Sequence, residues 1–127
     1  MSVLTFPNVE RLKSRKIIAT LFDKNSSKSF SQYPIRVVWV ENTSSEQSVQ
    51  VAFSVPKRAF KRAVARNRIR RLMQETYRLN KESLHNGLDE RVQRYSLMLI
   101  YVAKEELPYT TINEAMRSLM RRFVKFA

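Results

Sequence analysis

The chain has 127 residues, a formal net charge of +13, 43% hydrophobic residues, one glycine and no cysteine. This length and hydrophobic content fit one folded domain and exclude a low-complexity or wholly disordered chain. The lack of cysteine excludes disulfides, thiolate metal sites and a thiol nucleophile and is typical of the reducing cytoplasm, whereas the excess positive charge predicts a polyanionic partner such as RNA or DNA.

The first part of the chain predicts an arm, a short helix and an edge strand. Residues 1–10 show no helical period and are expected to form a flexible N-terminal arm. Ser14 can cap a short helix that ends at residue 22. A polar segment follows, with a brief edge strand expected at residues 28–31. One face of the short helix carries Ile18, Leu21 and Phe22.

Two segments rich in β-branched residues predict strands at residues 35–41 and 48–55. The first places Ile35, Val37 and Trp39 on one face. The second alternates in the same way, and a short polar turn separates the two, so we expect them to pair as an antiparallel hairpin. Its residues expected in the core are Val49, Val51, Phe53 and Val55.

A basic stretch follows Pro56 and continues into a long helix. No acidic residue interrupts it between Glu46 and Glu75. We expect the helix to begin near Ala63 and to end near residues 84–85, because the Asn86-Gly87 pair favours a left-handed stop. The cations of this stretch are Lys57, Arg58, Lys61, Arg62, Arg66, Arg68, Arg70 and Arg71.

The long helix has two opposite faces. The apolar face carries Ala65, Ile69, Leu72, Met73, Thr76 and Leu79. The polar face carries Asn67, Arg70, Arg71, Gln74 and Arg78, with Arg66 and Arg68 on its flanks. A solvated surface helix usually mixes both signs of charge, so this cationic face favours nucleic acid. The apolar face is too narrow for a membrane-surface helix.

The C-terminal third predicts one strand and one helix. Residues 95–103 are apolar at odd and even positions, which predicts a central strand covered on both faces. Thr111 and Glu114 have capping-box spacing at the start of the last helix. That helix buries Ile112, Met116, Leu119, Met120 and Phe123 and exposes Arg117, Arg121, Arg122 and Lys125.

These elements predict a single α+β domain over residues 1–127, in the order α-β-β-β-α-β-α. The helix between residues 55 and 95 joins two strands that can be parallel neighbours, for which the usual expectation is a right-handed crossover. We see no signal peptide, and the longest apolar run, residues 97–103, is too short to cross a bilayer.

The sequence shows no group of residues in a pattern typical of an active site. The only histidine, His85, lies at a predicted helix end, where a solvated cap is the usual role. The acidic residues are scattered, and one glycine cannot build a phosphate-binding loop. We therefore expect any reacting groups to belong to a partner.

Three aromatic residues have two possible roles. Phe22, Tyr33 and Trp39 can stack on unpaired bases, as single-stranded RNA sites often require. Core packing is the alternative, and the alternation of residues 35–41 favours it for Trp39, which shares a face with Ile35 and Val37.

The segment Ala63-Val-Ala-Arg66-Asn67-Arg68-Ile-Arg70-Arg71-Leu72 resembles the Arg-Asn-Arg helix of the protein subunit of bacterial ribonuclease P. The preceding Ser54-Val55-Pro56-Lys57-Arg58 stands where that family carries a strand ending in a basic pair. The resemblance extends from Arg11 through the last helix. It implies the family fold, a mostly antiparallel central sheet whose β-α-β crossover is left-handed.

The resemblance also implies a function, the endonucleolytic removal of the 5′ leader from precursor tRNA. In this family the catalyst is an RNA that holds Mg²⁺, so no catalytic residue and no metal site are expected in this chain. The protein would bind the leader and the catalytic RNA and would raise substrate and Mg²⁺ affinity. The expected partners are that RNA and precursor tRNA, with no membrane, and the free chain is expected to be a cytoplasmic monomer.

The resemblance further assigns residues to two sites. Ile18, Phe22 and Trp39 would line a leader cleft between the sheet and the first helix. Ile18 stands where other members often carry Phe, and Gln74 where a further basic residue is frequent. The expected RNA-binding residues are Lys57, Arg58, Lys61, Arg62, Arg66, Asn67, Arg68, Arg70, Arg71, Gln74 and Arg78.

Two other functions are compatible with a basic chain. One is a stand-alone RNA-binding protein of the ribosomal or RNA-chaperone type, without a reaction. The other, a DNA-binding regulator, is less favoured because no helix precedes the basic helix at helix-turn-helix spacing.

Overall fold

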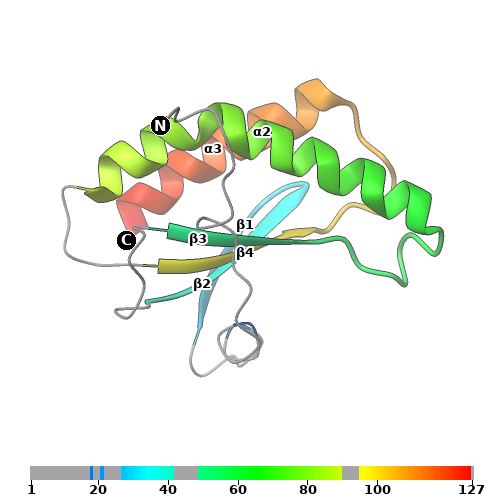
Figure 1. Ribbon diagram of the computed structural model, residues 1–127, viewed down its shortest axis with the longest axis horizontal. Coiled ribbons are helices and arrows are strands. Elements are labelled where there is room, and N and C mark those ends of the chain that lie inside the picture. Colours follow the sequence, from blue (N-terminus) through cyan, green and yellow to red (C-terminus); the bar gives the residue numbers. More distant parts are fainter. Residues whose placement is uncertain (1–17, 19–20, 22–26, 42–48, 90–94, 127) are drawn as a thin grey trace.

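The computed structural model describes residues 18, 21, 27–41, 49–89 and 95–126, and no side chain is described at 82–89 or 126. Within these ranges a four-stranded sheet is covered on one face by two long helices (Figure 1). This arrangement confirms the predicted α+β class. The elements are β1 Lys28–Gln32, β2 Ile35–Glu41, β3 Val49–Ser54, α2 Ala63–Asp89, β4 Tyr95–Tyr101 and α3 Tyr109–Phe126. Ile18 and Leu21 are also helical, and the rest of the predicted first helix and the arm lie outside the described residues.

The strand order is β1-β2-β4-β3. β1 pairs with β2 and β2 with β4 in antiparallel fashion, whereas β3 and β4 are parallel. The predicted hairpin between residues 35–41 and 48–55 is therefore wrong, because β4 lies between these strands. The physical reason is the composition of β4, whose residues are buried on both faces except for the half-buried Ile100. Such a strand is most stable at the centre of a sheet.

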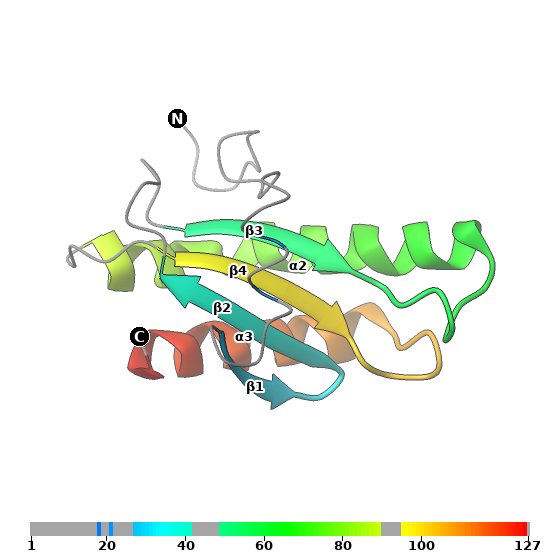
Figure 2. The ribbon, with the colours of Figure 1, turned by 90° about the horizontal axis from the view of Figure 1, so that it is seen from below.

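The crossover from β3 through α2 to β4 is left-handed, as the family resemblance implies. Figure 2 shows β3 and β4 pointing the same way with α2 behind the sheet, and the path from β3 to β4 turns against the usual right-handed sense. α2 begins beside the carboxyl ends of β3 and β4, because it follows β3 in the chain and the two strands are parallel.

The main core lies between the sheet and the two helices. Val37 of β2, Leu97 and Leu99 of β4 and Phe123 of α3 are fully buried in it. Trp39 is 6% exposed, and its ring makes edge contacts with Phe30 at 5.7 Å and Phe123 at 5.1 Å between centroids. The alternation of β2 therefore predicted its inward face correctly.

The buried stripe of α2 is rotated relative to the predicted one. Ile69, Met73 and Thr76 are buried as expected, but Leu79 is 39% exposed. Tyr77, which was not among the residues expected on the apolar face, is fully buried against Phe53 with ring centroids 5.8 Å apart. Burial of the large Tyr77 ring removes more apolar surface from water than burial of Leu79 would. The helix is therefore rotated about its axis so that Tyr77 faces β3.

The helix α2 is also longer than predicted, since it continues through residues 86 and 87 and ends at Asp89. Glycine permits a left-handed stop without requiring one. α3 begins at Tyr109, ahead of the predicted capping box, and the amides of Thr111 and Ile112 donate to the carbonyl of Pro108. The five residues expected on its buried face are all fully buried.

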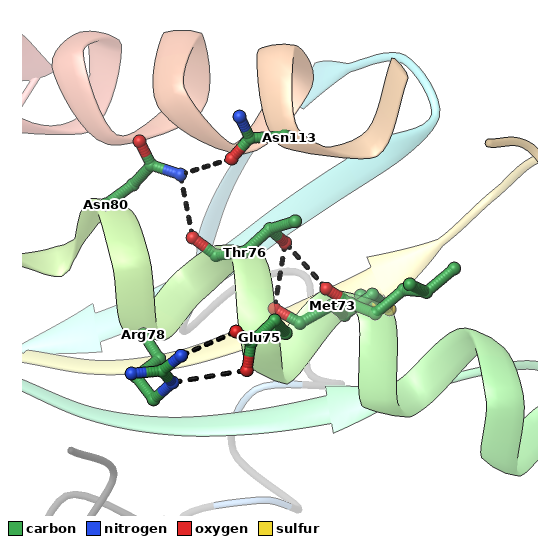
Figure 3. A network of polar contacts seen from close by, with 7 residues as sticks. Met73, Glu75, Thr76, Arg78, Asn80 and Asn113 are labelled. Atoms are coloured by element: carbon green, nitrogen blue, oxygen red, sulfur yellow. Dashed lines mark hydrogen bonds and ion pairs between the residues drawn. The ribbon is translucent and has the colours of Figure 1, made fainter. Parts of the chain in front are cut away.

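A polar contact joins the two helices inside this layer. The side-chain amide of Asn80 donates to the carbonyl oxygen of Thr76 at 2.8 Å and to Oδ1 of Asn113 at 2.7 Å. Figure 3 shows Asn80 directed toward α3, while Glu75 and Arg78 lie on the side of α2 away from Asn113. This contact lies on the side of α2 that faces α3.

The loop between β4 and α3 is held by the hydroxyl of Tyr101. This hydroxyl donates to the carbonyl oxygen of Glu105 at 2.6 Å and accepts from the amide of Leu107 at 3.0 Å. The Tyr101 ring is fully buried against Phe60. The loop is therefore anchored on both sides of Glu106.

We expect Tyr101→Phe to lower the free energy of unfolding by about 1–2 kcal/mol, because the amide of Leu107 loses its acceptor.

Burial raises the pKa of the Tyr101 phenol. Its neutral form is therefore favoured in the folded state, and the stability it contributes is lost as pH rises through the raised pKa, above about 10. Urea denaturation at neutral and alkaline pH measures both effects. If Tyr101→Phe lost as much stability at alkaline pH as the unmodified chain, the expected effect of the Tyr101 phenol on alkaline stability would be contradicted.

The face of the sheet opposite the helices carries a second, smaller core. Leu21, Val38 and Met98 are buried there, and Ile18 packs against them. None of the described helices combines the length and apolar character needed to span a membrane.

Candidate nucleic-acid interface

The segment between β3 and α2 presents cations because one aromatic residue anchors it. Phe60 is buried against Tyr101, and the amides of Ala59 and Phe60 donate to the carbonyl of Pro56. The chain turns tightly around this anchor, so its charged side chains point to solvent. The exposed cations of this turn are Lys57, Arg58, Lys61 and Arg62.

The first turns of α2 continue this basic surface. Asn67, Arg68 and Arg71 are exposed, and Arg66, Arg70, Gln74 and Arg78 are half-buried. The structure thus brings the predicted RNA-binding residues of the turn and the helix together on one surface. Its outward orientation is the arrangement that a polyanion-binding role requires.

The two flanking arginines are held by the protein itself. Arg66 donates through Nη1 to the carbonyl oxygens of Phe60 at 2.8 Å and Lys61 at 2.9 Å, which ties the turn to the helix. Arg68 donates through Nε and Nη2 to the two carboxylate oxygens of Glu106 at 2.7 and 2.8 Å. This hydrogen-bonded pair lowers the pKa of the Glu106 carboxyl, so it stays ionised at neutral pH.

The outward arginines differ in their partners. Arg70 donates to Oδ1 of Asn67 at 2.8 Å, and Arg78 forms a forked contact with Glu75 (Figure 3). The hydrogen bond from Arg78 lowers the pKa of Glu75. Among the described residues Arg71 has no side-chain partner, so its full charge faces solvent.

A groove of about 1250 Å³ lies on the face of the sheet opposite α2 and α3. Val38 and Ile100 give it apolar walls, and Arg36 donates to the hydroxyl of Ser29 at 3.0 Å within it. It extends to the segment after β3, where it reaches the basic surface of the turn. The remaining lining residues are Leu21, Ser27, Pro56, Arg58, Ala59, Tyr101, Val102, Ala103 and Lys104.

Of the three residues expected in a leader cleft, the two that the structure describes lie on opposite faces of the sheet. Ile18 packs on the face opposite α2 and α3, in the same cluster as the groove residue Leu21. Phe22 lies outside the described residues. Trp39 lies on the opposite face, under α3, so its assignment to the cleft is corrected to core packing. The reason is the period of the strand, which sends Trp39 and Val38 to opposite faces.

Sequence reasoning missed three charged residues at these surfaces. Arg36 could have been predicted from the alternation of β2, because it shares its face with the groove residue Val38. Lys104 and Glu106 lie in a loop without period, and only the folded chain brings them to the groove and to Arg68. Within the described ranges, no three His, Cys, Asp or Glu side chains gather where they would hold a metal ion.

Comparison with known proteins identifies the family. The family model described as Ribonuclease P matches residues 6–124. The chain belongs to the ribonuclease P family. The ribonuclease P protein component of Porphyromonas gingivalis is 44% identical over 117 residues, which cover 88% of this chain and 82% of that protein. The ribonuclease P protein component of Chlorobium phaeobacteroides is 38% identical over 85 residues, 64% of this chain and 57% of that protein.

Solved structures of ribonuclease P proteins share the fold. The protein from Staphylococcus aureus superposes with a TM-score of 0.70 at 16% identity, covering 90% of this chain and 94% of that one. The protein from Thermotoga maritima gives a TM-score of 0.69 at 21% identity, covering 89% and 96%. Membership of the ribonuclease P family does not favour the alternative of a stand-alone RNA-binding protein.

Proposed function

We propose that this chain is the protein component of a ribonuclease P ribonucleoprotein and assists a catalytic RNA in removing the 5′ leader from precursor tRNA. Family membership supports the assignment to a tRNA-processing enzyme. The observation that carries it is the outward, cationic start of α2, where Asn67 and Arg71 are exposed and no acidic residue precedes Glu75.

The proposed role of the basic surface is electrostatic. Catalytic RNA and precursor tRNA repel each other, and cations placed between them reduce that repulsion and displace condensed counterions. Side chains held by the protein, such as Arg66, present fixed donors, whereas Arg71 presents its charge to solvent. Prepositioned donors lose little entropy on binding, which would raise affinity for both RNAs. A substrate held more tightly in the complex would in turn keep the Mg²⁺ sites of the catalytic RNA assembled at lower Mg²⁺ concentration.

We propose that the groove on the face opposite α2 and α3 receives the single-stranded leader. Its apolar walls at Val38 and Ile100 suit the faces of unpaired bases, and Arg36, Arg58 and Lys104 suit phosphate oxygens. Because the groove reaches the turn before α2, a leader lying in it would be guided toward the RNA bound there.

The proposal places the cleavage chemistry and its Mg²⁺ ions in the RNA partner. This chain would contribute binding and positioning, which lower the entropic cost of bringing the scissile phosphate to the catalytic RNA. We propose that the free protein is a monomer and that it acts in the cytoplasm, in keeping with its lack of cysteine.

Reconstitution tests this function. Addition of the chain to a ribonuclease P RNA should accelerate leader cleavage from precursor tRNA, with the largest gain at low Mg²⁺, because protein cations then replace the missing metal charge. Gel analysis of the released leader across a Mg²⁺ series measures it. A basic ribosomal protein of similar net charge is the control. No acceleration beyond that control would contradict the proposed function.

A further inference from the structure

Arg68, one of the predicted RNA-binding residues, is held by a carboxylate from a loop that is distant in sequence. Both oxygens of Glu106 accept from it, at 2.7 and 2.8 Å, across 38 positions of sequence. The two side chains remain 58% and 38% exposed. An acidic residue has thus been brought to the edge of the basic surface.

The loop that carries Glu106 is braced from the core. The buried Tyr101 hydroxyl bonds the carbonyl of Glu105 and the amide of Leu107, the residues on either side of Glu106. Immediately afterwards, the carbonyl of Pro108 accepts from the amides of Thr111 and Ile112 in the first turn of α3. Glu106 is therefore presented on a supported backbone, and this support is independent of the pair with Arg68.

The pairing leaves one edge of the Arg68 guanidinium free. Glu106 takes the Nε–Nη2 edge, so the Nη1 hydrogens and the second Nη2 hydrogen remain available to an outside acceptor. That edge fits two phosphate oxygens or the acceptor edge of a guanine. An exposed arginine otherwise samples many rotamers and must lose that freedom on binding.

The charge of the pair also matters. Arg68 and Glu106 together carry no net charge, so the pair contributes little to long-range attraction of RNA. An exposed ion pair also contributes little to stability, although a forked pair such as this one lies at the upper end of the usual range. A carboxylate at this position therefore brings neither electrostatic steering nor much stability, whereas it does fix the plane of the guanidinium.

We propose that Glu106 is a positioning residue that orients Arg68 so that its open edge meets the catalytic RNA. This inference rests on the proposed function, which supplies the RNA partner. It assigns a binding role to an acidic side chain that would otherwise be expected only to repel RNA. Glu106 acts through Arg68 and makes no contact with RNA.

The adjacent Glu105 provides a matched control. It is exposed, has no side-chain partner among the described residues, and carries the same charge one position away. Glu105→Gln and Glu106→Gln therefore raise the net charge equally. If charge alone mattered, both variants would bind the RNA slightly more tightly than the unmodified chain.

We expect Glu106→Gln to bind ribonuclease P RNA about five-fold more weakly than Glu105→Gln, a typical coupling for a paired contact. We expect no further loss when Glu106→Gln is added to Arg68→Ala, because Glu106 then has no guanidinium to orient. Filter binding of the full chain at physiological salt measures all four variants, and thermal melting checks that they fold.

Several results would overturn the inference. Binding of Glu106→Gln as tight as that of Glu105→Gln would show that Glu106 has no orienting role, and tighter binding would make it a competitor of the RNA. If Glu106→Gln lowered RNA affinity further in the Arg68→Ala background, Glu106 would act through a residue other than Arg68. Normal binding by Arg68→Ala would also refute it. The proposed function is tested separately by Arg71→Ala, which lacks any contact with Glu106.

Discussion

Replacement of Arg70 and Arg71 by alanine is expected to weaken binding of the catalytic RNA by roughly a hundred-fold or more, because each charged contact contributes about 1.5 kcal/mol or more. Arg71 faces solvent without a described partner, and Arg70 is oriented by Asn67. Each lost phosphate contact should also make the slope of log affinity against log salt shallower by up to about one unit. Holoenzyme turnover should fall most at the lowest Mg²⁺.

Binding isotherms over a salt series and turnover over a Mg²⁺ series measure these effects. Arg117→Ala with Arg121→Ala is the matched control, because it removes the same charge from exposed positions on α3. If this control loses as much affinity, net charge and not the α2 surface determines binding. Equal activity of the Arg70/Arg71 variant and the unmodified chain at the lowest Mg²⁺ would refute the proposed interface.

Trp39→Ala is expected to lower the free energy of unfolding by about 3–5 kcal/mol, the usual cost of removing a large buried aromatic side chain. The variant loses two edge contacts, with Phe30 and with Phe123, and leaves a cavity under α3. Urea denaturation measures the loss. Trp39→Phe should retain much of the stability, because it keeps an aromatic ring in the same place.

Val64→Ala is the control for Trp39, because Val64 is 68% exposed and its truncation should change stability by less than about 0.5 kcal/mol. A stable Trp39→Ala protein that binds the leader poorly would contradict the core assignment and would restore Trp39 to the leader cleft. Leader affinity is best compared by competition between precursor and mature tRNA.

Local patterns in the sequence predicted which side of β3 and of α3 is buried. The alternation of β3 placed Val49 and Val51 correctly, and the period of α3 placed Met116 and Phe123. Such patterns depend only on neighbouring residues, so a sequence reveals them directly. The outward face of α2 was predictable for the same reason.

Pairing and long-range contacts were less predictable. The apolar character of β4 indicated a central strand, yet the short turn after β2 favoured a hairpin that the fold does not contain. The rotation of α2 depends on the fit between Tyr77 and Phe53, which no helical wheel includes. The salt bridge between Glu106 and Arg68 joins a loop to a helix, and neither segment alone indicates that the two residues meet.

The central position of β4 has a consequence for synthesis on the ribosome. Because β4 pairs with both β2 and β3, neither of those earlier strands can complete the sheet until residues 95–101 have left the exit tunnel. Chains grow at about 5–20 residues per second, so the strongly basic α2 emerges seconds before the layer beneath it exists. During that interval α2 has no complete sheet to pack against, and the last quarter of the polypeptide supplies β4 and α3, which complete the layers on which its buried side docks.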